Sequence, residues 1–397
     1  MFHGRNLRIA IVHASWAEDL VAERVYNSLC HIWPEADLFL LERPGSLGRS
    51  LHESSEPAPK AASGSEFNPA GHPRRRIVRW SHLDPRAELE LHGYDLLIST
   101  SPPAACQIAA ETALHLCYLT PCSNPRTISD AHIPHGERID SLLHYRQWND
   151  RSVVHRAHEG GEPILSLRSV THFIASSYAS RDRHRPILGT ACPVIHPPVD
   201  TLHFRPGDEA REAFYLLVCR GLPPAGVELA IEAIETAGRE LVIVGWKGDG
   251  MADLPAHNHV RLVEAASDAA LRDYYRRCRA LIVPVASDFD LASVEAQACG
   301  TPVIALHGGG AAEIILDSES GGPGTGVFFH EPTVASLVSA LKEVERRPHK
   351  CSAALGWAQA TKFSTAHFEH ALRTFATHLC EATRATRELE SQRRRAA

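Results

Sequence analysis

The sequence predicts an α/β protein with two doubly wound parallel-sheet domains that face each other across a cleft. Its 397 residues exceed one ordinary core and suit two domains of about 150–200 residues each. Short β-branched runs alternate with helical patterns toward both ends of the chain, which is typical of parallel βαβ units. A proline-containing stretch separates these two series, and we interpret residues 196–206 as a linker.

The first series of elements predicts one sheet within an N-terminal domain of residues 1–195. Apolar residues recur at helical spacing in Leu20–Trp33, which predicts an amphipathic helix. Short apolar runs of the kind found in buried strands flank it and recur later in the domain. These predicted strands are Arg8–His13, Ala36–Leu41, Tyr94–Ser99 and Leu114–Leu119.

An insertion of low complexity interrupts this first domain at about residues 53–76. Its segment Glu53–Gly71 is rich in Ser, Pro, Ala and Gly and lacks a periodic apolar pattern, so we expect it to be mobile. It ends in Arg74-Arg75-Arg76, with Arg79 and Trp80 close behind. This basic stretch is either a solvated loop end or a peripheral contact with anionic membrane headgroups.

The second series predicts another parallel sheet in a C-terminal domain of residues 207–365. Its strands are separated by helical patterns such as Val227–Ala237 and Ala269–Cys278. The predicted strands are Tyr215–Cys219, Leu241–Val244, Val260–Val263, Ala280–Val285 and Pro302–Ala305. A last helix, within residues 366–397, is expected to pack back toward the first domain and to fray near Arg393-Arg394-Arg395.

The composition excludes several classes of protein. A formal charge of -6 argues against a nucleic-acid binder. The ten cysteines lack the paired Cys/His spacing of a zinc site, so we expect reduced thiols. The sequence has no apolar run of the ~18 residues that span a bilayer and no signal-peptide pattern at its start. These features predict a cytoplasmic protein, with peripheral membrane contact through Arg74–Arg76 as an open alternative.

Several motifs occur in a fixed order along nearly the whole chain. The most specific is SDFDLASVEAQACGTPVIALHGGGAAEII, Ser287–Ile315. The others are IVHASWAEDLVAERVYNSL, YDLLISTS, THFIASSYASRDR with VIHPPVD, and LLVCRGLPPAGVELAIEAI with LVIVG. Together they resemble the family 4 retaining glycosyltransferases, particularly bacterial mannosyltransferase-like members that build surface polysaccharides. The resemblance implies a GT-B fold, with two Rossmann-like domains, acceptor in the first and nucleotide sugar in the second.

The resemblance also implies a set of site residues. Arg220 matches the family's diphosphate arginine, the candidate catalytic residue, because cations stabilise charge that develops on the leaving group. Glu295 matches the second glutamate of the E-x7-E motif, which binds the nucleotide ribose. The remaining substrate-binding candidates are Glu23, Asp288, Phe289, Asp290, Leu291, Gly308, Gly309 and Glu313.

Each of these assignments has a structural alternative. Arg220 could pair with a surface acid, and Glu295 could stabilise a helix N-terminus. The run Gly308-Gly309-Gly310 could form only a flexible turn between a strand and a helix. Asp288-Phe289-Asp290 is formally a DxD motif, but such short matches arise often by chance. We therefore expect no metal and no cofactor, with the nucleotide sugar acting as substrate.

Departures from the family pattern fall on the donor site. Leu20-Val21-Ala22 replaces the glycine pair that precedes the acid matched by Glu23. Ala225 replaces a diphosphate lysine, Ser287 replaces the first glutamate of E-x7-E, and Asp290 replaces a loop glycine. Two hypotheses follow: an active hexosyltransferase with a remodelled donor site, or a catalytically silent homologue that binds or regulates an active one. An epimerase or dehydrogenase is disfavoured because no GxGxxG motif follows the first strand.

Overall fold

The structure is a computed structural model of the chain. Two features predicted from the sequence lie outside the residues that the structure describes. They are the insertion at residues 53–76, including Arg74–Arg76, and the candidate Arg220. The described ranges are 7–14, 20–42, 77–81, 89–101, 105, 108–110, 114–120, 169–188, 192–219, 222–245, 259–264, 266–318 and 322–396.

The first domain is built on a six-stranded sheet in which all neighbouring strands are parallel. Its strand order is β3-β2-β1-β5-β7-β8. The strands are β1 (Ile9–Ala14), β2 (Asp37–Glu42), β3 (Ile77–Ser81), β5 (Leu96–Ser99), β7 (Leu114–Leu119) and β8 (His172–Ala175). Two short strands, β4 (Leu89–Glu90) and β6 (Ile108–Ala109), pair separately. The side chains of β1, β5 and β7 are buried along their whole length, which explains the continuous apolar runs in the sequence.

The second domain repeats this topology with the order β11-β10-β9-β12-β13-β14, again entirely parallel. Its strands are β9 (Phe214–Val218), β10 (Glu240–Val244), β11 (Val260–Val263), β12 (Leu281–Val283), β13 (Val303–Leu306) and β14 (Gly326–Phe329). Ignoring the short pair in the first domain, both sheets follow the 3-2-1-4-5-6 order of Rossmann folds. The predicted fold class of two doubly wound α/β domains is therefore confirmed.

Helices connect the strands and close the molecule. In the first domain they are α1 (Leu20–Ile32) and α4 (Tyr178–Leu188). In the second they are α5 (Pro224–Ala237), α6 (Asp268–Arg277), α7 (Leu291–Ala298), α8 (Ala311–Ile314), α9 (Val334–Arg346) and α10 (Ala353–Ala360), with the short turns η4 (Pro348–Lys350) and η5 (Thr361–Phe363). The chain ends in the long helix α11 (Thr365–Ala396).

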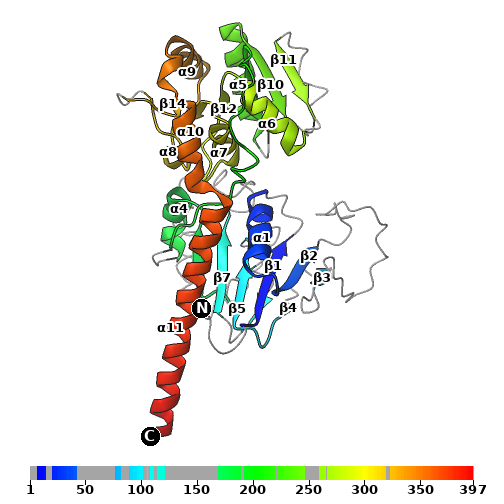
Figure 1. Ribbon diagram of the computed structural model, residues 1–397, viewed down its shortest axis with the longest axis vertical. Helices are drawn as coiled ribbons and strands as arrows, with labels where there is room; N and C mark the ends of the chain where they lie inside the picture. Colours follow the sequence, from blue (N-terminus) through cyan, green and yellow to red (C-terminus); the bar gives the residue numbers. More distant parts are fainter. Residues whose placement is uncertain are drawn as a thin grey trace, which may run out of the picture.

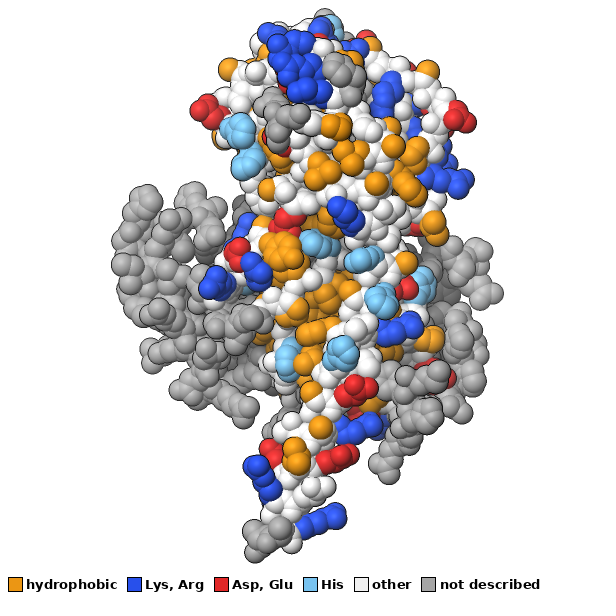
Figure 2. All heavy atoms as spheres, turned by 60° about the vertical axis from the view of Figure 1, so that its left-hand side comes forward, with side chains coloured by type: hydrophobic (Ala, Val, Ile, Leu, Met, Phe, Trp, Pro, Cys, Tyr) orange, Lys and Arg blue, Asp and Glu red, His pale blue; other side chains and the backbone are white. Residues whose placement is uncertain are grey.

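Helix α11 starts beside the second domain and runs down the first (Figure 1). It contacts α1, and Phe368 packs edge-on against Tyr118 of β7 with ring centroids 6.0 Å apart. The helix continues through Ala396, and the fraying expected at Arg393–Arg395 stays a prediction. No Gly or Pro interrupts residues 365–396, and arginines in the last turn suit the negative end of the helix dipole. Acidic and basic side chains lie near one another on this protruding end (Figure 2).

The chain crosses between the domains twice, and the two crossings are hydrogen-bonded to each other. The amide of Val199 donates to the carbonyl of Phe363 at 2.9 Å, and the amide of Thr365 donates back to the carbonyl of Val199 at 3.0 Å. One cluster of buried apolar side chains extends from the first domain through Val199 and Phe204 into the second. These crossings place the two sheets so that segments from both can meet at one interface.

Candidate functional site

The candidate site lies where segments after the strands of one domain meet segments after the strands of the other. Helices α1 and α4 follow β1 and β8 in the first domain, and α7 and α8 follow β12 and β13 in the second. Ligands of doubly wound sheets bind beyond the carboxyl ends of the strands, near the point where strand order reverses. Three carboxylates of the second domain, Asp288, Glu295 and Glu313, contact the first domain here, and we call them the cleft acids.

Glu295 is the most deeply buried of the cleft acids. It lies in α7 with no exposed side-chain surface, and its Oε1 is paired with Nη2 of Arg24 from the first turns of α1. The hydroxyl of Tyr275 in α6 donates to Oε2 at 2.8 Å. Both oxygens of the carboxylate that the sequence matched to ribose binding therefore have protein partners, one from each domain.

Asp288 meets the first domain through α4. Nη2 of Arg183 lies 2.8 Å from Oδ1 of Asp288, although without the alignment of a hydrogen bond, so the contact is electrostatic. The Asp288 side chain is buried, whereas that of Arg183 is about half exposed. Burial raises the pKa of Asp288, while Arg183 and His184 oppose the rise and Glu313 adds to it.

Glu313 caps α4 across the domain boundary. Its carboxylate accepts hydrogen bonds from the backbone amides of Tyr178 and Ala179 at 3.0 and 2.9 Å, and lies 3.0 Å from Nε2 of His196. The first amides of a helix have no partner within it and attract negative charge. Although burial opposes the change, the contacts with His196 and the two amides lower the pKa of Glu313.

The loop between β12 and α7 holds the other acidic candidate, Asp290. It is the N-cap of α7, and its Oδ2 accepts from the amide of Ser293 at 2.9 Å and from the Ser293 hydroxyl. Burial raises the pKa of Asp290, and the bonds from Ser293 lower it. Phe289 and Leu291 on either side are buried in the core. Both acids of the DxD motif thus have protein partners, Arg183 for Asp288 and Ser293 for Asp290.

The glycines before α8 are held against that same loop. A Cβ on Gly309 would lie 2.3 Å from the carbonyl oxygen of Ser287, and one on Gly310 would lie 2.1 Å from that of Asp288. Gly308 and Gly309 also have positive φ values of 137° and 56°. The close approach that these glycines allow is therefore between two loops of the second domain, and it fixes the backbone around Asp288.

The remaining candidates lie at the start of α1 and before α5. Glu23 is half-buried in the first turn of α1, and the side chains of Val21 and Ala22 point into the core. Ala225, at the position of the family's lysine, is exposed in the first turn of α5. Arg220 lies outside the described residues, so the structure does not place it relative to Glu295.

Four groups at the interface escaped prediction: Arg24, Arg183, Tyr275 and His196. Arg24 directly follows the acid singled out by the motif, and Arg183 lies in the quoted stretch THFIASSYASRDR. His196 lies within 6.0 Å, ring centre to ring centre, of Tyr178, Phe289 and Phe363. Site residues were assigned by their match to the family's motifs, and no motif singled out any of these four.

A buried histidine lies at the carboxyl end of β1. His13 Nδ1 is 2.8 Å from the hydroxyl of Thr100, and its ring stacks on Tyr26 with centroids 4.8 Å apart. Burial lowers the pKa of His13 to about 4, so its imidazole is neutral near pH 7. A neutral imidazole can accept a proton, but its present partners also suit a structural role.

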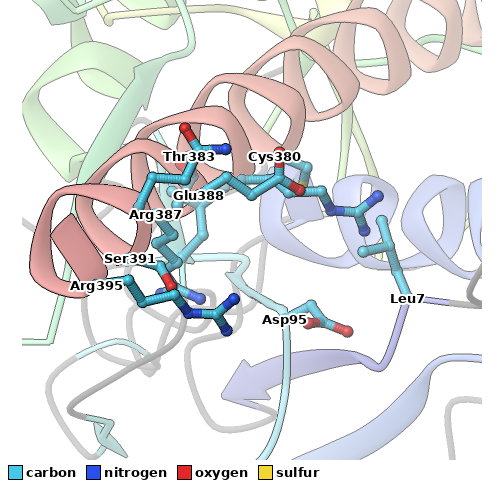
Figure 3. Close-up of a pocket in the computed structure, with 11 residues that line it drawn as sticks. Leu7, Asp95, Cys380, Thr383, Arg387, Glu388, Ser391 and Arg395 are labelled. Atoms are coloured by element: carbon cyan, nitrogen blue, oxygen red, sulfur yellow. The ribbon is translucent and has the colours of Figure 1, made fainter.

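A separate hollow of about 420 Å³ lies at the opposite edge of the first sheet. Its lining includes Leu7, Asp95 and Leu114, at the amino ends of β1, β5 and β7, and arginines from the last turns of α11 (Figure 3). Ligands of such sheets bind at the other edge, so we assign none here. Within the described ranges, no group of His, Cys, Asp and Glu is arranged to hold a metal ion. The described helices include none that is both long and apolar enough to cross a membrane.

Sequence comparison finds that much of the second domain is similar to a known family. Residues 199–358 match the model of the family described as Glycosyl transferases group 1. D-inositol 3-phosphate glycosyltransferase 2 of Catenulispora acidiphila is 34% identical over 212 residues, which are 43% of this chain and 48% of that protein. D-inositol 3-phosphate glycosyltransferase of Mycobacterium avium is 31% identical over 224 residues, 51% of either chain. The chain thus matches about half the length of these curated relatives.

Structural comparison covers nearly the whole chain. Anabaena HepE in complex with UDP superposes with a TM-score of 0.66 at 15% identity, covering 94% of this chain and 100% of that one. Sucrose-phosphate synthase from Thermosynechococcus elongatus gives a TM-score of 0.65 at 14% identity with the same coverage. At these identities the likeness shows the fold alone, and that fold is the GT-B arrangement of two Rossmann-like domains.

Proposed function

We propose that the chain is a glycosyltransferase that transfers a hexose from a nucleotide-sugar donor to a saccharide or lipid-linked acceptor, with retention of configuration. The observation that carries the proposal is the position of Glu295. This residue falls within the segment that matches the group 1 family and lies after β12, where a GT-B donor site would be. The names of the sequence relatives add an inositol phosphate to the acceptors worth testing.

The chemistry assigned to the chain is electrostatic. As the glycosidic bond of the donor breaks, negative charge grows on the departing diphosphate, and cationic groups in the cleft stabilise it. Arg220 is the proposed partner of that charge, because its guanidinium can bind two phosphate oxygens at once. Glu295 is the proposed acceptor of hydrogen bonds from the ribose hydroxyls. Glu313 helps to hold the two domains around the donor by capping α4.

We further propose that the reaction needs no metal ion. The DxD motif would have to supply the ligands, yet Asp290 caps α7 and Asp288 faces Arg183. Neither carboxylate could bind a cation without losing a partner, and Arg183 would repel it.

A second candidate function is a catalytically silent homologue that binds or regulates an active glycosyltransferase. It is favoured by the lost family residues at Ala225 and Ser287, and by the fact that both oxygens of Glu295 have protein partners. Each missing contact to a diphosphate costs about 1.5–3 kcal/mol, so the affinity for a donor should be weak.

Calorimetry with UDP- and GDP-sugars, followed by turnover assays with saccharide, lipid-linked and inositol phosphate acceptors, tests these proposals. We expect binding at micromolar or weaker affinity, and sub-micromolar binding would contradict the remodelled donor site. Arg220→Ala and Glu295→Gln should each abolish turnover while circular dichroism shows a folded chain. Binding without turnover for any acceptor would favour the silent homologue, and absence of binding to every nucleotide sugar would refute the donor site.

A further inference from the structure

The inference concerns Arg24 and rests on the proposed function. The side chain of Arg24 is 15% exposed, and Glu295 beside it has no exposed side-chain surface. The guanidinium also lies over the ring of Phe204, 5.9 Å from its centroid. Arg24 belongs to the first domain and Glu295 to the second, so this ion pair crosses the interface between the domains, where a nucleotide would bind.

Because Glu295 has no exposed side-chain surface, a ribose can reach its carboxylate only if one of the present partners moves. Oε1 is held by Arg24 and Oε2 by the hydroxyl of Tyr275. Tyr275 is fully buried within the second domain, whereas Arg24 reaches across from the other domain. Arg24 is therefore the partner that a ribose hydroxyl would displace from the carboxylate.

Displacement would leave the guanidinium of Arg24 without its counter-charge. An unpaired guanidinium charge in a largely desolvated position is strongly unfavourable. The other cleft acids already have partners, since Asp288 faces Arg183 and Glu313 binds the first amides of α4 and His196. A ligand that takes Glu295 must therefore bring an anion of its own for Arg24.

We propose that Arg24 is a donor-site cation supplied by the first domain. When a nucleotide binds, the Arg24 side chain moves from Glu295 to the diphosphate. A nucleoside diphosphate contains a new partner for each side chain. Its ribose hydroxyls donate to the carboxylate of Glu295, and its phosphate oxygens accept from the guanidinium of Arg24. After the exchange the guanidinium of Arg24 is paired with phosphate, and the carboxylate of Glu295 accepts hydrogen bonds from the ribose and from Tyr275. It also supplies a cation to a site whose family lysine is replaced by Ala225.

The experiment compares how much the two phosphates add to binding in matched variants. Calorimetry measures the dissociation constants of uridine and UDP, and of guanosine and GDP, for the full chain and for Arg24→Gln, Arg24→Lys and Arg183→Gln. The ratio of nucleoside to diphosphate dissociation constants is the phosphate increment. Arg183→Gln is the control, because it also removes an ion pair between the domains but does not touch Glu295.

We expect Arg24→Gln to reduce the phosphate increment at least tenfold and to bind the nucleoside no more weakly than the unchanged chain. Arg24→Lys should keep most of the phosphate increment, because it retains the positive charge. If Arg24→Gln does not fold, the Arg24→Lys variant is the one that is measured. Arg183→Gln should leave the increment unchanged. An unchanged increment in both Arg24 variants, or an equal loss in Arg183→Gln, would overturn the inference while leaving the proposed function intact. No binding of UDP or GDP to the unchanged chain would overturn the proposed function and the inference with it.

Discussion

Glu345 shows how strongly single residues outside the site are determined by their neighbours. In α9, its carboxylate accepts from the Tyr215 hydroxyl at 2.9 Å, from Arg239 at 2.7 and 2.8 Å, and from Arg279 at 2.8 Å. These bonds, that of Arg239 first, lower the pKa of Glu345 to about 2. Burial and the adjacent carboxylate raise the pKa of Tyr215. The network ties Tyr215 of β9, and the residues just before β10 and β12, to helix α9.

The pH dependence of this network has a definite sign. A carboxylate with a lowered pKa stabilises the folded chain above its ordinary value near 4.5, and this stability is lost as pH falls from there toward 2. We expect Glu345→Gln to reduce the free energy of unfolding at pH 7 by about 2 kcal/mol, because hydrogen bonds to a charged group are lost. Urea denaturation from pH 7 to pH 4 should show the difference from the unchanged chain beginning to narrow below about pH 4.5.

Glu343→Gln, on the same helix, is the matched control. Glu343 pairs with Arg346 and Arg347, three and four residues further along the chain, and such local ion pairs contribute little. Its substitution should change the urea midpoint much less at every pH. Equal effects of the two variants would show that the contacts of Glu345 with Tyr215 and Arg279 add nothing.

At the scale of elements, the packing of two loops determines the geometry around the candidate site. Gly310 is the N-cap of α8 and has an ordinary φ of -69°, so position 310 requires glycine for steric reasons alone. Its amide donates to the carbonyl of Ser287 at 2.8 Å, and any Cβ would collide with the backbone of Asp288. Backbone atoms cannot move aside as a flexible side chain can, so the loop that holds Asp288 must shift.

We therefore expect Gly310→Ala to destabilise the chain by about 1–3 kcal/mol, the usual cost of an overpacked position. Gly322→Ala is the control, because nothing lies within 4 Å of a Cβ there and its φ is not positive. That variant should be neutral or slightly stabilising. Thermal denaturation of both variants measures the contrast, and equal melting temperatures would show that the two loops separate easily.

The sequence predicted elements well wherever an apolar run was long and bounded. The predicted strand Leu114–Leu119 and helix Leu20–Trp33 agree with β7 and with α1 to within one residue. Strand β14, Gly326–Phe329, was not predicted, because four residues starting with a glycine carry no period that separates a strand from a loop. Its pairing with β13 comes from the sheet and not from local propensity.

At the scale of the whole molecule, the sequence identified the acids that the second domain places at the interface but not their partners in the first domain. Asp288, Glu295 and Glu313 were chosen by their match to the family's motifs, and they lie after β12 and β13, on the side of the carboxyl ends of these strands. Their partners could not be predicted, since Arg24 is separated from Glu295 by 271 positions and the contact depends on how the domains are oriented. A pattern within one domain carries no information about that orientation.

Two kinds of contact hold the domains in this orientation. The paired crossings at Val199 and Phe363, with the apolar cluster around them, join the domains covalently and by packing. The cleft acids and their partners add charged contacts. Interfaces between domains of one chain commonly permit relative motion. The contacts of long polar side chains break and form again more readily than the packing of an apolar core. The charged contacts are therefore the ones expected to open.

We expect the double variant Arg183→Gln, Glu313→Gln to open the cleft while the crossings act as the hinge. The first change removes the charge that faces Asp288, and the second weakens the cap on α4 and the contact with His196. Small-angle scattering should then give a larger radius of gyration than for the unchanged chain. The control is Arg276→Gln, Glu209→Gln, which removes an ion pair inside the second domain and should leave the radius unchanged. An unchanged radius in the first variant as well would show that two of the three acid contacts are dispensable for closure, and that apolar packing and the pair of Arg24 with Glu295 suffice.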